Sequence, residues 1–249
     1  MEDDPNASEG SAPGSLRALL TEGAVIVVSI LLAFAVDAAW DRHLQRQQFE
    51  EDLEQVREQL VVDLDGLNGA IEDSESVLDR LDMFMGLPPA ALAALEPDSI
   101  EYALNGLRLR GIYDQSGLGV EAFVRDGQVS FVADPLARAL IRIWSSLEEE
   151  LSEDYAAVVA TDPLIQQVLA SHGIMAARLG RSRSIPGARS LKDAAFDLRA
   201  DPVALDVAAE RRLSVESYLR NLVTIRDRLF VTLLDILGAP AAAQLNEGE

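Results

Sequence analysis

Side chains that could support acid–base or metal chemistry are few in this sequence and lie far apart. His43 and His172 are the two histidines, and neither lies in a His-Glu-x-x-His motif or another paired-ligand spacing. The chain has no cysteine, which excludes disulfides, thiolate catalysis and cysteine-ligated metals. We therefore expect neither a metal site nor a cofactor.

Two acidic runs and a pair of glycines are further candidates for chemistry. The runs at residues 50–52 and 148–150 could attract cations, but acidic runs on amphipathic helices are usually solvated faces. Gly117 and Gly119 lack the third glycine and the preceding strand of a phosphate-binding loop. Serine and carboxylate residues have no partnering histidine in a recognisable motif. We expect no enzyme, and a hydrolase-like activity is the alternative.

A reversal of charge marks an arginine-rich segment. The chain carries a formal net charge of −21, yet no acidic residue occurs from Pro163 to Lys192. Such a segment could contact an acidic protein partner or anionic lipid headgroups, and the alternative is an ordinary solvated loop. The arginines that we assign to this contact are Arg178, Arg181, Arg183 and Arg189.

The longest uncharged stretch runs from Gly23 to Val36. Fourteen helical residues rise about 21 Å, less than the roughly 30 Å of a hydrocarbon core. Apolar neighbours on both sides extend the stretch to residues 16–40, a length that can span the bilayer. We therefore predict a transmembrane helix over 16–40.

The residues around this stretch suit a membrane. Carboxylates near the interface reach headgroup water, tryptophan favours the aromatic belt, and arginine can snorkel. Two small residues four positions apart could let neighbouring helices approach closely. The predicted interface residues are Glu22, Asp37, Trp40 and Arg42, and the predicted helix-packing residues are Ser29 and Ala33.

Two alternatives to an anchor follow from the same stretch. Ala33, Phe34 and Ala35 form a small-x-small pattern typical of signal-peptide cleavage, although residues 1–15 are acidic and contain no basic residue. A core helix of a soluble domain would show an amphipathic stripe, whereas this stretch is apolar on every face. We favour the uncleaved anchor.

The remainder of the chain reads as helices. Residues 1–15 and 239–249 are predicted to be disordered tails, 41–87 a stalk helix, and 88–238 a helical bundle domain. Apolar residues of the stalk recur at steps of three and four, with polar Ser74 at one skipped position and one stutter from Leu60 to Leu64. Their positions are Phe49, Leu53, Val56, Leu60, Leu64, Leu67, Ile71, Leu78, Leu81 and Met85.

Two later helices begin with the same signal. Asp134 and Asp201 each precede a proline, which combines an N-cap acceptor with proline at the first helical position. Residues 174–190 read as a loop between them. The sequence therefore predicts an all-α protein, in which a transmembrane helix continues into a stalk and an elongated antiparallel bundle. If successive long helices alternate direction, the arginine-rich segment returns to the membrane.

Two blocks resemble a large bacterial family of single-pass membrane proteins of unknown function. The first block, residues 22–60, contains the anchor, Trp40 and a charged heptad helix. The second, residues 120–149, shares an aromatic and a glycine turn before Asp-Pro and a long helix. The matching positions are Phe123, Gly127, Asp134, Pro135 and Leu140, and the departures are Ser29 and Asp126. The resemblance implies a helical domain outside the cytoplasm and supplies no activity.

Composition and resemblance together set the functional expectation. The acidity of the chain disfavours nucleic acid as a partner, because a negatively charged protein surface repels the phosphate backbone. We predict a bacterial inner-membrane protein with an extracytoplasmic C-terminal domain, although arginines after the anchor favour the opposite orientation by positive-inside counting. We expect a scaffold or interaction protein that can form homo-oligomers through its anchor and stalk. A domain that senses a small ligand is the alternative.

Overall fold

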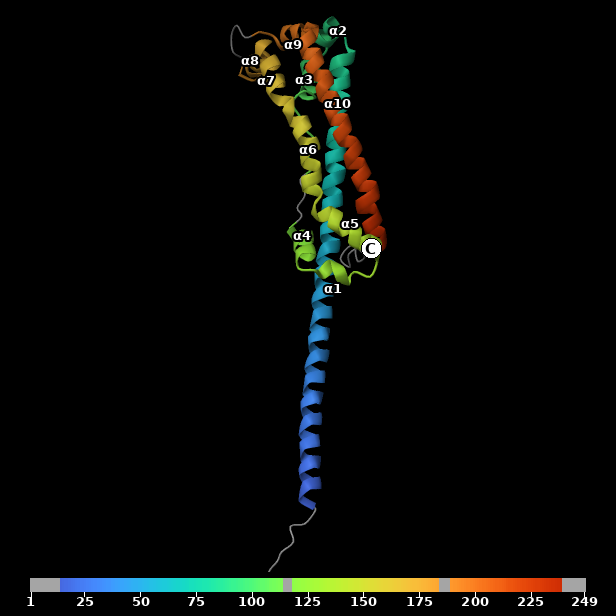
Figure 1. The fold of residues 1–249 in the computed structure, drawn as a ribbon. Coiled ribbons are helices and arrows are strands. Elements are labelled where there is room, and N and C mark those ends of the chain that lie inside the picture. Colours follow the sequence, from blue (N-terminus) through green and yellow to red (C-terminus); the bar gives the residue numbers. More distant parts are fainter. Residues whose placement is uncertain (1–13, 114–117, 184–188, 239–249) are drawn as a thin grey trace, which may run out of the picture. The chain divides into compact units, whose positions relative to one another are not determined.

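The computed structural model describes residues 14–113, 118–183 and 189–238. The predicted tails over 1–15 and 239–249 lie outside this range, apart from residues 14 and 15. The chain divides into two compact units, residues 1–51 and residues 52–249. Helices account for nearly all of the described residues, which form no β-strand and confirm the predicted all-α fold (Figure 1).

The first helix, α1 (Gly14–Gly86), begins in the first unit and ends in the second. In the first unit, its most apolar window has a mean hydropathy of 2.2, and no residue of that window is buried. Large apolar side chains such as Val28 and Phe34 are more than half exposed. This helix is long and apolar enough to cross a membrane.

The second unit contains the end of α1 and a series of shorter helices. These are α2 (Pro89–Ala94), α3 (Pro97–Asn105), α4 (Leu118–Arg125), the 3-10 helix η1 (Gln128–Phe131), α5 (Pro135–Ser145), α6 (Leu147–Ala160), α7 (Asp162–Ser171), α8 (Ile174–Arg183), α9 (Leu191–Ala200), α10 (Pro202–Ile225), the π-helical turn η2 (Arg226–Phe230) and α11 (Val231–Leu237).

Helix α1 presents an unbroken heptad seam to the core of the second unit. The predicted stutter from Leu60 to Leu64 is wrong, because Asp63 occupies the next seam position and is buried, and Ser74 is buried at its predicted position in the seam. Leu64 is only half-buried. The steps alternate strictly between four and three, as in a coiled-coil seam. The seam residues are Val56, Leu60, Asp63, Leu67, Ala70, Ser74, Val77, Leu81 and Phe84.

Residues 106–113, which we call the strap, run back along α1 after α3 ends. A Cβ at Gly106 would lie 2.8 Å from the main-chain nitrogen of Leu81, and one at Gly111 would lie 2.6 Å from that of Ser74. Both contacts are too short for any other residue, so glycine is required where the strap crosses α1. The strap thus lies directly against α1.

The far end of the strap is fixed near the start of the second unit. A Cβ at Gly66 would lie 3.9 Å from the Tyr113 ring, and the Tyr113 amide donates to the Tyr218 hydroxyl at 3.1 Å. An extended chain advances more than twice as far per residue as a helix. The short strap therefore carries the chain from Leu81 back to Gly66.

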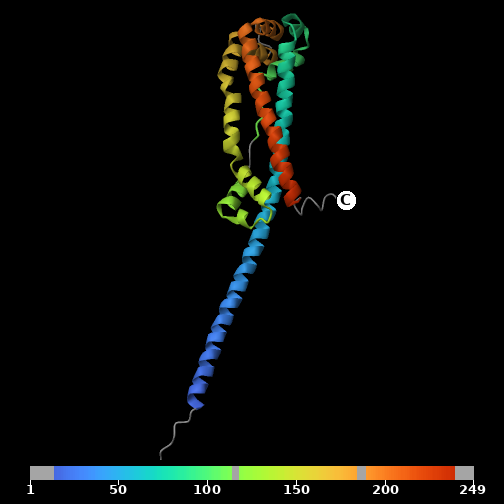
Figure 2. The same cartoon turned by 45° about the vertical axis from the view of Figure 1, so that its right-hand side comes forward.

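This return decides the direction of the later helices. The Trp144 indole of α5 donates to the Asp63 carboxylate at 2.9 Å, and the Arg199 guanidinium of α9 donates to the Met85 carbonyl at 2.6 Å. Helices α6 and α7 therefore run parallel to this part of α1, and α10 runs antiparallel to them (Figures 1 and 2). The expectation that helix 134–172 returns along the stalk is wrong, because the strap makes that return.

Helix boundaries follow local signals with one exception. Asp134 accepts hydrogen bonds from the amides of Leu136 and Ala137, at 2.7 and 2.9 Å, which confirms the predicted N-cap. Gly173, with φ of 68°, separates α7 from α8. The predicted loop over 174–190 is wrong in its first half, because Ile174–Arg183 continues as helix and is rich in good helix formers.

We expect aspartate at Leu60 or Leu67 to destabilise the second unit by about 4 kcal/mol, because it would bury an unpaired charge in the seam. Thermal unfolding of the full chain in detergent measures the effect. The matched control is Val62→Asp on the same helix, where the side chain is 60% exposed. Equal midpoints for Leu67→Asp and Val62→Asp would contradict the seam.

Candidate functional site

The predicted interface residues all lie on the exposed surface of α1 in the first unit. Glu22, Asp37, Trp40 and Arg42 are exposed, and the rings of Trp40 and His43 lie 6.1 Å apart. This part of α1 is therefore not enclosed by a protein core. Contact with lipid stays a prediction.

The two small residues of the anchor also lie on the exposed helix surface. The Ser29 hydroxyl donates to the Val25 carbonyl of its own helix at 2.8 Å, so its polar group is satisfied within the helix. Ala33 is exposed one turn later. Because neither side chain needs a distant partner, another helix could approach this surface closely.

The arginine-rich segment packs at the end of the second unit where α1 ends. The Arg178 guanidinium donates to the Asn105 side chain at 2.8 Å, and Arg181 pairs with Asp98 and with Glu101, the latter at 3.1 Å. Burial and then the charge of Arg108 lower the pKa of Arg178. These two arginines attach α8 to α3.

The third described arginine has a similar local role. Arg189 pairs with Asp197 of α9 and donates to the Asp193 carbonyl at 3.0 Å. The side chain of Arg183 lies outside the described residues. Acidic groups of the same unit thus partly neutralise the arginines that were predicted to contact an anionic partner. These arginines lie at the end of the second unit that contains Met85, not at the end that begins with Asp52.

An open hollow of about 370 Å³ lies among these arginines. It is lined by Pro97, Ala177, Gly180, Arg181, Arg189, Ser190, Leu191 and Lys192. Asp193 receives a hydrogen bond from the Ser190 hydroxyl at 2.7 Å, and Arg189 pairs with Asp197. These neighbouring carboxylates compete with any anionic ligand, so the hollow is only weakly suited to one.

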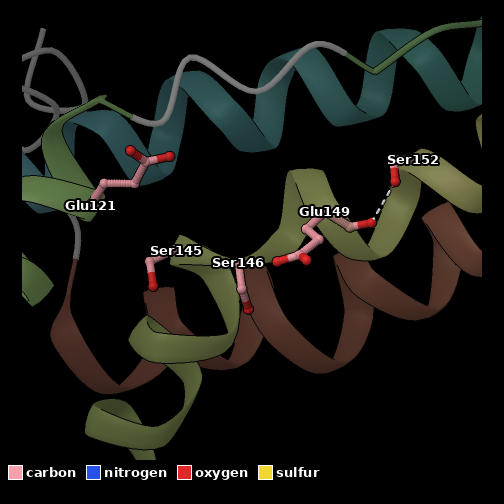
Figure 3. A pocket seen from close by; sticks show the side chains of 5 residues that line it. All are labelled: Glu121, Ser145, Ser146, Glu149 and Ser152. Atoms are coloured by element: carbon pink, nitrogen blue, oxygen red, sulfur yellow. Dashed lines mark hydrogen bonds between the residues drawn. The ribbon is translucent and has the colours of Figure 1, made fainter.

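A second open hollow, of about 380 Å³, is lined by Glu121, Ser145, Ser146, Glu149 and Ser152 (Figure 3). Three serine hydroxyls could suggest nucleophilic catalysis. Each of them donates to a carbonyl of the preceding turn, and the Ser152 bond to Glu149 measures 2.7 Å. No histidine is among the lining residues, so this hollow lacks the base that activates a serine.

His172 lies between a serine and an aspartate, as in a catalytic triad. Its Nδ1 lies 3.1 Å from the Ser171 hydroxyl and 2.9 Å from the Val168 carbonyl, and its Nε2 lies 3.3 Å from Asp201. A carbonyl can only accept, so Nδ1 must carry a proton and cannot take one from Ser171. The histidine therefore joins the end of α7 to the start of α10.

The most strongly connected polar group is Arg211, which is completely buried in α10. Its guanidinium donates to the Leu109 carbonyl of the strap at 2.9 Å and to the Thr161 hydroxyl at 3.2 Å. It also donates to the Val158 carbonyl and pairs with Asp162 at 3.2 Å. One side chain thus joins the strap, the α6–α7 turn and α10.

Electrostatics around Arg211 follow from its burial. Burial, and then the charge of Arg110, lower the pKa of Arg211 to about 10, so it stays protonated at neutral pH. Arg110 of the strap also pairs with Asp162. Sequence reasoning missed this cluster, although one signal existed: Arg211 falls on the buried stripe of α10, between Ala208 and Val215.

Comparison with protein-family models, curated proteins and solved structures finds no match to this chain. The described residues also contain no group of three or more histidine, cysteine or acidic side chains that could hold a metal ion. The polar clusters of the second unit join helices to one another, and they pair no nucleophile with a free base within the described residues.

We expect Arg211→Met to destabilise the protein by about 3–5 kcal/mol, because the Asp162 carboxylate and the carbonyls of Leu109 and Val158 would lose a buried donor. A fall of roughly 10 °C in Tm, measured on the full chain in detergent, corresponds to this loss. Arg220→Met is the control, since the Arg220 side chain is 72% exposed. Similar melting of both variants would contradict the role of Arg211.

Proposed function

We propose that the protein is a bacterial single-pass inner-membrane protein whose second unit serves as an interaction or scaffold module. The observation that carries the proposal is the fully exposed apolar helix of the first unit, whose hydropathy and length suit a bilayer. In water, such a surface would favour association or aggregation. Lipid is therefore its natural environment.

The distribution of polar residues along this helix supports the same proposal. Glu22 and Asp37 border the uncharged stretch, and Trp40 and Arg42 follow it. Carboxylates at these positions reach headgroup water, whereas a carboxylate at the centre of the bilayer would be costly. The resemblance of residues 22–60 to an anchored bacterial family supports this assignment.

The second unit fits interaction better than ligand sensing. Its core is closed by large buried side chains such as Trp144, Tyr218 and Phe230, and the two hollows described above are open to solvent. Small-molecule sites are usually enclosed and largely apolar. Homo-oligomers through Ser29, Ala33 and the stalk are part of the proposal, and crosslinking of the intact protein in membranes tests them.

We expect the anchor to remain uncleaved, because the residues before it are acidic and lack the basic region of a signal peptide. Intact-mass measurement of the membrane-purified protein should give the mass of a chain that retains residues 1–35. A mature chain that starts near Val36 would contradict the anchor.

We expect the second unit to lie outside the cytoplasm, as the family resemblance implies. An alkaline phosphatase fused to the C-terminus should then be active, and a green fluorescent protein at the same position should be dark. A fusion at the N-terminus provides the opposite control. The reverse pattern at the C-terminus would place the second unit in the cytoplasm.

A further inference from the structure

His172 lies where four helices of the second unit meet. It is the C-cap residue of α7, and Gly173 separates it from α8. Asp201, the residue before α10, lies opposite its ring, and α9 packs against α8 and α10 at the same end (Figure 1). The His172 side chain is only 16% exposed. Its ring nitrogens therefore depend mainly on protein groups for hydrogen bonds.

Both nitrogens of the His172 ring face oxygen atoms. Nδ1 lies 2.9 Å from the Val168 carbonyl, and Nε2 lies 3.3 Å from a carboxylate oxygen of Asp201. The Ser171 hydroxyl, 3.1 Å from Nδ1, donates to the same carbonyl at 2.9 Å. A neutral imidazole has one N–H and one lone pair, so either neutral tautomer would point a lone pair at one of these acceptors. Only the doubly protonated ring donates to both.

The ends of the helices contribute to the electrostatics of this pair. The carboxyl end of a helix favours a cation, and the amino end favours an anion. His172 lies at the carboxyl end of α7, and Asp201 caps α10 by accepting from the Val203 amide at 2.9 Å. The amino end of α8, which begins at Ile174, opposes the charge of the ring. The Asp201 carboxylate, with one oxygen on the cap and the other on the ring, is therefore the decisive partner.

Other charged side chains around the junction have partners of their own. Arg189 donates to the main-chain carbonyl of His172 at 3.4 Å and pairs with Asp197 of α9. Asp193 of α9 accepts from the Ser190 hydroxyl. Among the described residues, Asp201 is the one acidic group within ion-pair distance of the ring. The other arginines of α8 and α9 with described side chains contact α3 or the end of α1, and they are Arg178, Arg181 and Arg199.

We infer that His172 and Asp201 form a pH-sensitive junction, which holds α7 against α10 while the ring carries both protons. Loss of the Nε2 proton to solvent leaves a lone pair facing the carboxylate, so attraction between the two side chains becomes repulsion. The unfolded chain offers the ring no such partner. Acidification therefore stabilises the second unit through this pair, within the range from pH 5 to 8 in which histidine changes charge. The junction does not depend on the proposed anchor.

Asp201→Asn is the decisive variant, because asparagine caps a helix about as well as aspartate but carries no charge. Asp134→Asn is the matched control, since Asp134 caps α5 before a proline and pairs with no histidine among the described residues. Thermal unfolding of both variants and the wild type is measured on the full chain in detergent. The measurements are made at about pH 5.5 and about pH 8.5, on either side of the range in which histidine titrates.

At the lower pH, we expect Asp201→Asn to melt roughly 2–4 °C below the wild type, the shift that the loss of about one charged hydrogen bond gives in a domain of this size. At the higher pH, this difference should disappear or change sign, because the asparagine amide can donate to the neutral Nε2. Asp134→Asn should differ from the wild type by the same amount at both pH values.

Nitrogen NMR gives an independent measurement, because the chain holds only two histidines. His43→Gln replaces the exposed histidine of the first unit, so that His172 is the single ring in protein labelled with nitrogen-15 histidine. The shifts of the two ring nitrogens report how many protons the ring carries. We expect the second proton to leave at a higher pH when residue 201 is aspartate than when it is asparagine.

Three outcomes would overturn the inference. The first is loss of the second proton from His172 at the same pH with aspartate and with asparagine at residue 201. The second is the same pH dependence of melting for Asp201→Asn and Asp134→Asn. The third needs only the His43→Gln protein, and so decides even if Asp201→Asn does not fold: a second proton lost at or below about pH 6.5, the ordinary value for histidine, would show that the junction does not hold it.

Discussion

The heptad seam of α1 between Val56 and Phe84 is the surface on which the rest of the second unit is built. The strap crosses it at Leu81 and Ser74, and α5 reaches it through the hydrogen bond from Trp144 to Asp63. Because the steps alternate strictly between four and three, the seam stays on one side of the helix. Asp63 fits this seam because it accepts hydrogen bonds from the Trp144 indole and the Gln59 amide.

The strap lies against α1, so its main-chain amides and carbonyls need hydrogen-bond partners. The strap leaves the helical conformation after Arg108, and its carbonyl at Leu109 accepts a hydrogen bond from the guanidinium of Arg211. The same side chain binds the turn between α6 and α7, where Val158 and Thr161 offer acceptors. A buried arginine is costly without partners, so its several acceptors make the junction specific.

Charge is distributed unevenly over the second unit. Glu58, Asp65, Glu72 and Asp79 are exposed along one side of α1, whereas α5 contains no acidic residue. The arginine-rich segment, in contrast, pairs with Asp98, Glu101 and Asp197 of its own unit. Arginine content alone is therefore a poor guide to an anionic contact, because internal ion pairs can satisfy it.

Local pattern determined the helical fold, the exposed apolar span and the caps at Asp134 and Asp201, since each depends on residues close together in the chain. Tertiary structure decided what depends on distant partners. The sequence favours Leu64 as a seam residue, but burial against other elements places Asp63 in the seam instead. The direction of α6 and α7 depends on the strap, whose glycines permit a contact with α1 that no local periodicity reveals. Arg211 gains its role only when Leu109, Val158 and Asp162 meet around it, because a buried charge is tolerated where the fold supplies its acceptors.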